Sequence, residues 1–335
     1  MPAILPGICM AFGINIVLTT DRLWHADTVV PAISPVRRIT MRRLFHLAAA
    51  VAITALCTPT AHAATDWDAV AQALGKSGTE MPGGVYRVGL PRNDLHVQLD
   101  GIELKPGFAL GSWVAFSPMG QQAMVMGDLV LTEDEIEPVM KSLLDSGLQV
   151  TALHNHLFNA RPMPFYMHIG GTGDPAKMAG AIHTALALSK TPFTAAPAPA
   201  TPPPIDLATA AIDAALGAKG TNAGGVYQVG IPRAQPVMAM GMAVPGPMGG
   251  AESINFQPLG GGKAAITGDF ILVGKEVQPV IRALRSNGID VTAIHNHMLD
   301  DNPRMFFVHF WAHNDLNKLL TGLKAALAEV AVKKS

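Results

Sequence analysis

The sequence predicts an α+β protein built by tandem duplication of one antiparallel-sheet-plus-helices domain, with its copies related by a pseudo-twofold axis. The first observation is that a ten-residue stretch occurs twice, as Gly147–His156 and again as Gly288–His297, an offset of 288 − 147 = 141 residues. The second is that each copy alternates strand-like and helix-like stretches in the same order, with hairpin signals between strands. Two copies in one chain form the intramolecular counterpart of a symmetric dimer.

Composition excludes some classes of protein. A chain of 335 residues is long enough for two domains. Its 49% hydrophobic and 15% charged residues indicate well-formed cores and not a disordered chain. The formal net charge of −1 gives no sign of the basic surface typical of nucleic-acid-binding proteins, so we expect no nucleic-acid partner.

The N-terminal region, residues 1–63, is typical of an upstream stretch followed by a cleaved signal peptide. Met41–Arg43 supplies positive charge, Leu44–Cys57 is apolar, and Ala61–Ala63 is a small-residue cleavage motif. We expect translation to start at Met41 and the mature chain at Ala64. The apolar run is too short to cross a bilayer comfortably, so we expect no transmembrane span in the mature form. Leu56 stands where a lipoprotein signal needs a small residue, so the prediction is a soluble periplasmic or secreted protein.

Removal of this segment also removes both cysteines, Cys9 and Cys57. A metal site in the mature chain must therefore use His, Asp or Glu. From Ala64 onward, 19 Lys and Arg stand against 23 Asp and Glu, and the resulting net charge of −4 is ordinary for a soluble protein.

Repeat 1, residues 64–190, is predicted to begin with a short amphipathic helix, because its apolar residues recur at helical spacing. Asp100-Gly101 marks a tight hairpin turn. Thr132 caps a helix that starts with three acidic residues, and Gly147 follows it as a C-terminal cap. The predicted helices are 66–74, 132–146 and 175–189; the strands are 85–90, 97–104 (a hairpin), 113–116, 123–131, 149–156 and 164–169, with a loop at 76–84 and a turn at 170–174.

Residues 191–204 are rich in Pro and Ala and are predicted to be an extended linker. Repeat 2, residues 205–335, follows the same order of elements. Its predicted helices are 207–216, 276–286 and 315–330, and its predicted strands are 226–231, 268–273, 289–297 and 304–311.

Histidines are concentrated in the repeated stretch and in the strand after it. Residues two apart on a strand share a face, so His154 and His156 point the same way and Asn155 points the other way. A hairpin centred near Arg161 would set His154 opposite His168 and His156 opposite Tyr166. The same construction in repeat 2 sets His295 opposite His309 and His297 opposite Phe307. Six of the nine histidines after residue 63 are these.

Three imidazoles with an open fourth position suit zinc, and imidazole also suits copper, nickel and iron. The sequence therefore predicts a transition-metal site, with zinc as the first choice, and its duplicate in the second repeat; whether the two sites are separate or meet at the repeat interface stays open. The predicted ligands are His154, His156 and His168 in repeat 1 and His295, His297 and His309 in repeat 2. Residues predicted to complete or orient these sites are Asn155, Asn296, Asp128, Asp269, Glu135, Glu276, Arg92 and Arg233.

Other interpretations stay open. The histidines are also compatible with a metal-free pocket for a small anionic or carbohydrate-like ligand, or with a purely structural polar network. Asp128 is also interpretable as part of a turn, and Glu135 as a charge that stabilises the helix dipole. Arg92 is also interpretable as one partner of a surface ion pair with Asp94. A metal-dependent hydrolase is a further alternative, although no residue stands out as a dedicated general base. The methionines near Met240 are compatible with Cu(I), but methionine commonly fills cores, and we interpret them so.

These motifs resemble the LppY/LpqO-like family of exported bacterial proteins, a domain of unknown function. The resemblance rests on Gly-Asp before a hydrophobic strand, a Glu-x-x-Pro-Val helix, Val-Thr-Ala-Leu/Ile-His-Asn-His and Pro-x-x-Phe-x-x-His. It extends over roughly residues 66–330. It implies a two-repeat exported protein, often a lipoprotein, and brings no established activity. The reaction, if any, and the oligomeric state are not predicted by the sequence.

Overall fold

A computed structural model of the protein describes residues 65–194 and 203–333. The predicted signal peptide and most of the predicted linker lie outside the described residues. The first half contains α1 (Trp67–Leu74), β1 (Thr79–Met81), β2 (Val85–Pro91), β3 (Gln98–Leu99), β4 (Ile102–Glu103), α2 (Pro106–Ala109), β5 (Gly111–Met119), β6 (Gln122–Leu131), α3 (Glu133–Asp145), β7 (Gln149–His154), β8 (Phe165–Gly173) and α4 (Pro175–Leu186).

The second half contains its elements in a matching order. They are α5 (Thr209–Leu216), β9 (Thr221–Ala223), β10 (Val226–Pro232), β11 (Met238–Ala239), β12 (Met242–Ala243), the short 3₁₀ turn η1 (Gly246–Met248), β13 (Ala251–Gly260), β14 (Lys263–Val273), α6 (Gly274–Ser286), β15 (Asp290–His295), β16 (Met305–Asp315) and α7 (Leu316–Leu327). Among the described residues, no helix is both long enough and apolar enough to cross a membrane.

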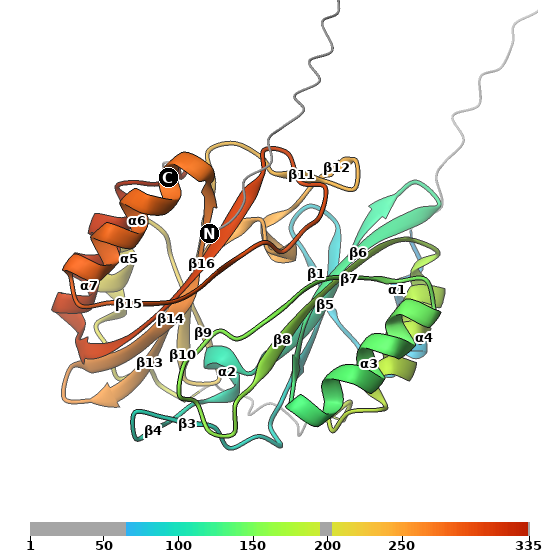
Figure 1. Ribbon diagram of the computed structural model, residues 1–335, viewed down its shortest axis with the longest axis horizontal. Helices are drawn as coiled ribbons and strands as arrows, with labels where there is room; N and C mark the ends of the chain where they lie inside the picture. The colour runs from blue at the N-terminus through green and yellow to red at the C-terminus, as the bar shows by residue number, and fades with distance from the viewer. Residues whose placement is uncertain (1–64, 195–202, 334–335) are drawn as a thin grey trace, which may run out of the picture. The chain divides into compact units, whose positions relative to one another are not determined.

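Each half is built on one six-stranded antiparallel sheet (Figure 1). The strand order is β1-β2-β5-β6-β8-β7 in the first sheet and β9-β10-β13-β14-β16-β15 in the second, so equivalent strands occupy equivalent places. The predicted α+β character with antiparallel sheets and helices in two sheet-rich halves is therefore confirmed. In both sheets, the strand that carries the His-Asn-His motif is an edge strand.

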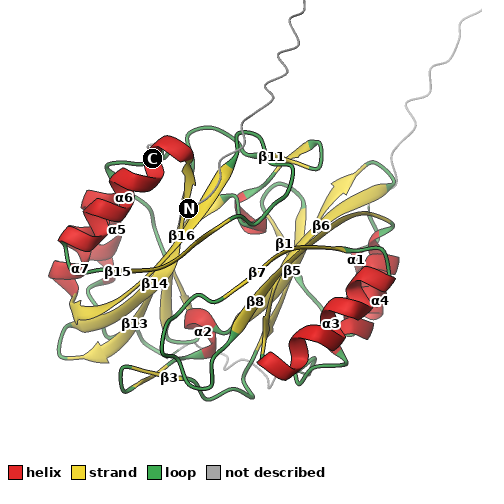
Figure 2. Ribbon diagram, in the orientation of Figure 1, coloured by secondary structure: helices red, strands yellow, loops and turns green. Residues whose placement is uncertain are grey.

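Helices cover one face of each sheet (Figure 2). In the first half, Val70, Val139 and Ile182 bring α1, α3 and α4 into a core with the sheet, and the second half has an equivalent core. The other faces share two further apolar clusters that contain residues of both halves, such as Met126 with Phe307 and Tyr166 with Trp311. Strand β6 is buried almost along its entire length, because helices cover one face of its sheet and the other half packs on the other face.

Glycine occurs in β6 and β14 at the places where neighbouring strands leave no room for a side chain. A Cβ on Gly127 would lie 2.9 Å from the Trp113 carbonyl oxygen, and one on Gly268 would lie 1.9 Å from the Ser253 carbonyl oxygen. The interpretation of Gly-Asp as a turn is therefore wrong, because both glycines and the aspartates that follow them lie inside long strands.

Several boundaries differ from the predicted ones. Thr79–Met81 forms the edge strand β1 where a loop was predicted, because it pairs with β2. Strand β8 runs through the predicted turn at Gly170, which pairs with Met126 of β6. Neighbouring strands thus impose extended structure on polar and glycine-containing segments whose local sequence does not favour it.

Candidate metal centre

The six recurring histidines lie on two strands of each half. His154 is the last residue of β7, His156 follows in the loop, and His168 lies within β8. Their counterparts in the second half are His295, at the end of β15, then His297 in its loop and His309 in β16.

The predicted hairpin registers are wrong by two residues. His154 pairs with Tyr166 and not with His168, which lies opposite Ala152. In the second half, His295 pairs with Phe307, and His309 lies opposite Ala293. The difference arises in the loops, because the first hairpin is centred on Ala160 and not on Arg161, and the second on Asp301 and not on Asn302. Each hairpin also contains a bulge on the far side of these pairs from the loop. Because the shift is two residues, the histidines keep the common face that the sequence predicted.

Histidines of the two halves meet in one cluster, which the sequence did not predict. The rings of His154 and His295 stack with centroids 3.6 Å apart. Two further contacts between halves have centroid distances of 3.7 Å, His156 with His309 and His168 with His297. By contrast, His154 and His168 of the same half are 5.1 Å apart. For each of the six imidazoles, the closest other imidazole thus belongs to the other half.

Aromatic rings close the cluster on two sides. Tyr166 stacks on His156 with centroids 3.3 Å apart, and Phe307 stacks on His297 at 3.4 Å. The Tyr166 hydroxyl donates to the Ala109 carbonyl oxygen at 2.6 Å, which fixes the ring. Sequence reasoning placed these residues in the hairpins but gave them no role. Their recurrence at the 141-residue offset was the signal that could have found them.

Two carboxylates join the histidines. Asp128 of β6 pairs in register with His168, and its Oδ1 lies 4.0 Å from His168 Nε2. Asp269 of β14 pairs in register with His309, with 2.8 Å between Oδ1 and Nδ1. Burial raises the pKa of Asp128 to about 7, and the negative charge of Asp269 acts in the same direction. The prediction that these two aspartates lie beside the histidines is consistent with this geometry.

Burial keeps most of the imidazoles neutral. It lowers the pKa of His154 to about 2 and that of His168 to about 3, and neighbouring histidines add to the effect. The pKa values of His156, His295 and His297 are lowered for the same reasons. Burial also acts to lower the pKa of His309, but the charge and hydrogen bond of Asp269 raise it above its ordinary value.

Many of these buried atoms have no hydrogen-bond partner among the described residues. They are His154 Nδ1, His156 Nε2, His168 Nε2, His297 Nε2, both ring nitrogens of His295, and one oxygen of Asp128. One histidine–histidine contact is short, with 3.1 Å between His154 Nε2 and His309 Nε2. Buried polar atoms are rarely left unpaired, so this concentration needs a physical explanation.

Ligand atoms lie close enough together to hold a metal ion. Four groups of three residues have their candidate atoms within 4.8 Å of one another, and every recurring histidine belongs to at least one group. The groups are His154, His168, His295; His154, His156, His309; His295, His297, His309; and Asp128, His156, His168. In the last group, all three of the residues present an unpaired buried atom.

The asparagines between the histidines hold the loop in place. Asn155 Nδ2 donates to the Pro164 carbonyl oxygen at 3.0 Å, and Asn296 makes the equivalent bond to Met305. As predicted for the opposite face, each asparagine bonds the backbone of the following segment and not a ring.

Arg92 and Glu135, predicted to support the site, instead bond to each other. Arg92 Nη1 lies 2.7 Å from Glu135 Oε2, and the arginine side chain is fully buried. Glu135 also accepts from the backbone N–H of Thr132 and thereby caps α3. The prediction of a surface ion pair at Arg92 is wrong, although the pair to Asp94 exists at 2.8 Å.

The second half repeats this arrangement. Arg233 pairs with Glu276 at 2.9 Å, and Glu276 accepts from the Val273 N–H. The described hydrogen bonds connect none of these groups to a histidine. Their role is to fix the start of α3 and α6 against the sheet.

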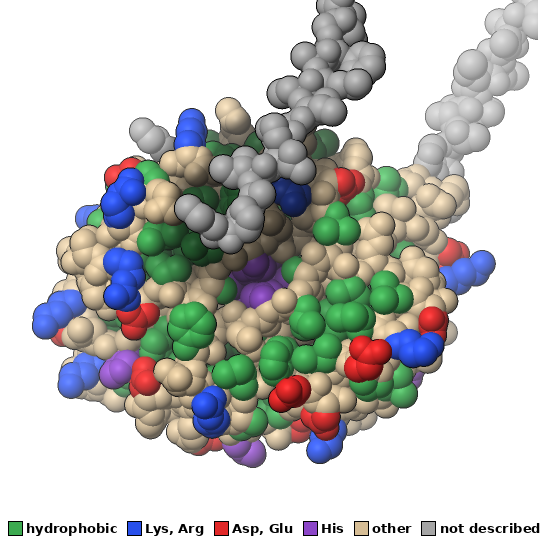
Figure 3. All heavy atoms as spheres, in the orientation of Figure 1, with side chains coloured by type: hydrophobic (Ala, Val, Ile, Leu, Met, Phe, Trp, Pro, Cys, Tyr) green, Lys and Arg blue, Asp and Glu red, His purple; other side chains and the backbone are tan. Residues whose placement is uncertain are grey.

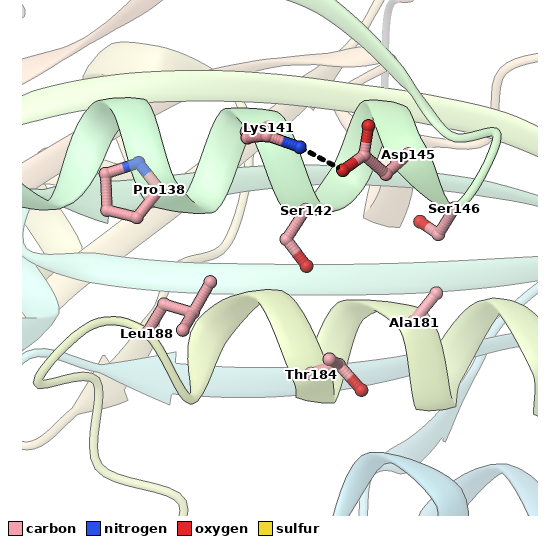
Figure 4. Close-up of a pocket in the computed structure, with 8 residues that line it drawn as sticks. All are labelled: Pro138, Lys141, Ser142, Asp145, Ser146, Ala181, Thr184 and Leu188. Atoms are coloured by element: carbon pink, nitrogen blue, oxygen red, sulfur yellow. Dashed lines mark hydrogen bonds and ion pairs between the residues drawn. The ribbon is translucent and has the colours of Figure 1, made fainter.

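The surface offers two other features for comparison. Histidine side chains are visible at the bottom of a hollow on the face drawn in Figure 3. A wide groove of about 510 Å³ lies elsewhere, between α3 and α4, and Lys141 and Asp145 form an ion pair on its wall (Figure 4). Its lining contains no histidine and no unpaired buried atom, so the histidine cluster is the better candidate for function.

Comparisons with known proteins give a family but no activity. Among solved structures, the trimeric bacterial microcompartment shell protein PduB matches at 13% identity and a TM-score of 0.19, over 76% of this chain and 89% of that chain. EtuB from Clostridium kluyveri matches at 9% identity and a TM-score of 0.18, over 75% and 88%. At such low scores these likenesses carry no argument. A search of curated proteins found no match.

A family model described as Domain of Unknown Function (DUF1259) matches residues 68–188 and again residues 210–329. The two matches cover most of both sheets and all six of the recurring histidines. The chain therefore belongs to this DUF1259 family and carries two tandem copies of its domain.

Proposed function

We propose that this protein is an exported transition-metal-binding protein, and that both repeats contribute ligands to one shared centre. The observation that carries the proposal is the set of unpaired, buried imidazole nitrogens. An unpaired buried polar atom costs roughly 1–3 kcal/mol, and six imidazoles contribute several such atoms at one place. A metal ion would satisfy them together.

The pKa values and charges around the cluster favour a bound metal cation over a network of hydrogen bonds among the histidines. Metal ions bind the neutral imidazole, and burial keeps His154 and His168 neutral well below pH 7. Asp128 and Asp269 supply negative charge to the same place. Zinc is our first choice, because nitrogen and carboxylate oxygen are its usual ligands, and copper, nickel and iron follow.

The cluster contains enough ligand residues to hold two metal ions. The group of Asp128, His156 and His168 and the group of His295, His297 and His309 share no residue. When bound, such an ion would supply Lewis acidity at this position. His154 lies between the groups, within reach of both His168 and His309.

We further propose that the repeats are related by a pseudo-twofold axis close to the contact of His154 with His295. The support is that exchanging the repeats converts the pair of His156 and His309 into the pair of His297 and His168. Both pairs have the same centroid distance of 3.7 Å. The finer assignment to LppY/LpqO-like proteins and the export through a cleaved signal are parts of the same proposal.

A metal-free pocket for an organic ligand is less well supported. The cavity beside His297 has a volume of about 10 Å³, room for roughly one water molecule. Pockets for small organic molecules usually measure about 300–1,000 Å³. The cavity next to His297 is thus far too small for such a molecule.

A metal-dependent hydrolase is the second candidate function. Asp128 favours it when the ion is held by His295, His297 and His309, because a carboxyl outside that group whose pKa is raised to about 7 can hold and release a proton at neutral pH. With the wild type and Asp128→Asn both saturated with zinc, hydrolysis of phosphate and carboxylate esters that is lost in the variant would support this candidate. A rate equal to that of zinc-free protein would remove it.

The decisive experiment is elemental analysis of the processed chain, purified without a histidine tag. The test variant carries His154→Ala, His156→Ala, His295→Ala and His297→Ala. A matched control carries His96→Ala and His313→Ala, two exposed histidines outside the cluster. We expect about one or two ions per chain in the wild type and the control, and none in the test variant.

The proposal fails if the wild type stays metal-free after reloading with zinc, copper, nickel and iron. It also fails if the test variant, folded by circular dichroism, retains the same metal content. N-terminal sequencing of the protein from a periplasmic fraction tests export, and a start other than Ala64 would contradict the predicted cleavage.

A further inference from the structure

The cavity beside His297 is lined by three methionines from three separate segments. Met126 comes from β6, Met240 from the turn between β11 and β12, and Met298 from the loop after β15. Met126 and Met298 are buried, with 7% and 3% of their surface exposed. His297, a member of the histidine cluster, lines the same cavity.

Met240 has a backbone conformation that its residue type does not favour. Met240 and Gly241 form the two-residue turn of the hairpin, with φ angles of 49° and 76°. Turns of this kind prefer Asn, Asp or Gly, and the first repeat has Asp100-Gly101 there with nearly identical angles. Both repeats keep the same turn geometry, although methionine adopts it less readily than aspartate. The presence of Met240 there indicates that its side chain has a function.

The side chain of Met240 reaches across to the other half. Its Sδ lies 3.7 Å from where a Cβ on Gly170 would stand, so it packs directly on the backbone of β8. The Met240 N–H donates to an oxygen of Asp300 at 3.2 Å, which ties the hairpin to the loop after β15. Thr151 donates to the His297 carbonyl oxygen at 2.6 Å and fixes the remaining wall.

The first repeat serves as an internal comparison. At the 141-residue offset, the equivalents of Met126 and Met298 are Thr267 and Leu157, and the hairpin equivalent of Met240 is Asp100. Leu157 and Thr267 are also buried, so the fold accepts other residues at these places. Core filling alone does not require three methionines around one cavity.

We propose that Met126, Met240 and Met298, together with His297, form a site for a soft monovalent cation, Cu(I), beside the histidine cluster. This inference rests on the proposed metal-binding function, because His297 belongs to both sites. Thioether sulfur and imidazole select Cu(I). All four of the ligands are neutral, so a single positive charge is buried at lower cost than a double one.

The lining of the cavity includes both exposed and buried residues. Leu299 and Asp300 are exposed, and His297 is buried. The Asp300 carboxylate attracts a cation to the cavity. A Cu(I) ion held by the methionines would then be in contact with an imidazole of the cluster, to which it can transfer without a redox step.

The test is an anaerobic Cu(I) competition titration against bicinchoninate, with Zn(II) binding measured on the same samples. The test variant is Met126→Leu/Met240→Leu/Met298→Leu, which conserves volume. The control variant is Met140→Leu/Met167→Leu/Met178→Leu, three methionines of the first half outside this cavity. We expect the test variant to bind Cu(I) more than about tenfold more weakly. Loss of a residue that only hydrogen-bonds a metal ligand already lowers metal affinity about 10–100-fold, and here the ligands themselves are lost. Zn(II) binding should stay unchanged.

A second measurement uses only the wild type. Ag(I), a redox-inert substitute for Cu(I), should protect Met240, which is only partly buried, from oxidation by hydrogen peroxide, as read by peptide mass spectrometry. Equal Cu(I) affinity in the test variant and wild type, an equal loss in both variants, or no protection by Ag(I) would overturn the inference. If Zn(II) still binds in those cases, the proposed function survives; if neither metal binds the wild type, both fail.

Discussion

Acid should destabilise the metal-free protein strongly, because the histidine cluster is buried in the neutral state. In the unfolded chain each histidine titrates near pH 6.5. In the folded chain the pKa of His154 is lowered to about 2 and that of His168 to about 3. Between these limits the unfolded state binds more protons than the folded state. The contribution to stability is therefore complete above about pH 6.5 and is lost as the pH falls.

The magnitude follows from proton linkage. At pH 5.5, one unit below the unfolded pKa, each such histidine lowers the free energy of unfolding by about 1.4 kcal/mol. His154 and His168 together give about 3 kcal/mol. The lowered pKa values of His156, His295 and His297 act in the same direction and bring the sum to roughly 7 kcal/mol. His309 and Asp128, whose pKa values are raised in the folded protein, oppose the change, and Asp128, with a pKa of about 7, offsets about 2 kcal/mol of it at pH 5.5. Domains are typically stable by about 5–15 kcal/mol, so the effect is large.

The assay is urea denaturation of chelator-treated protein at pH 7.5, 6.5 and 5.5, followed by circular dichroism. The variant that lacks His154, His156, His295 and His297 serves as the comparison and should lose much of the pH dependence. A wild-type free energy of unfolding that changes by less than about 1 kcal/mol between pH 7.5 and 5.5 would refute the reasoning. In that case the imidazoles would be hydrated or already protonated in the folded protein.

Three further predictions concern single residues. Arg92→Met should destabilise the protein by about 3–5 kcal/mol in urea titrations, because Glu135 would keep a buried charge without its partner; a loss below 1 kcal/mol would contradict the pairing. Gly268→Ala should cost more than about 1–3 kcal/mol, since its Cβ would overlap the Ser253 carbonyl oxygen, and an unchanged melting temperature would show that the strands can separate there. Asp128→Asn should weaken Zn(II) binding about 10–100-fold in a chelator competition, and an unaltered affinity would place Asp128 outside the centre.

The sequence predicted most elements of a single repeat, but not the edge strand β1 or the helix α2. The 141-residue offset, the hairpin signal at Asp100-Gly101 and the cap at Thr132 predicted elements that occur close to those places. The common face of His154 and His168 was also predictable, because it depends only on the two-residue period of a strand. The bulge before His154 was not predictable, since it is set by pairing with β8 and not by local residue preference.

The shared cluster could not be predicted from the repeat pattern. An internal repeat shows that two similar domains exist, but it carries no information about which faces they bury against each other. The contact of His154 with His295 depends on the edge strands β7 and β15 lying side by side, which is a tertiary property. The burial of Arg92 was missed for the same reason, because its partner Glu135 is 43 residues away.

The interleaving of the histidines removes the redundancy that gene duplication usually provides. In two independent sites, one copy could decay while the other kept working. Here His295 is the nearest ring neighbour of His154, and His297 that of His168, so damage to either copy disturbs histidines of both. The two halves must therefore evolve together. An ancestor with a single copy of the domain would have needed to form a homodimer to assemble the same cluster.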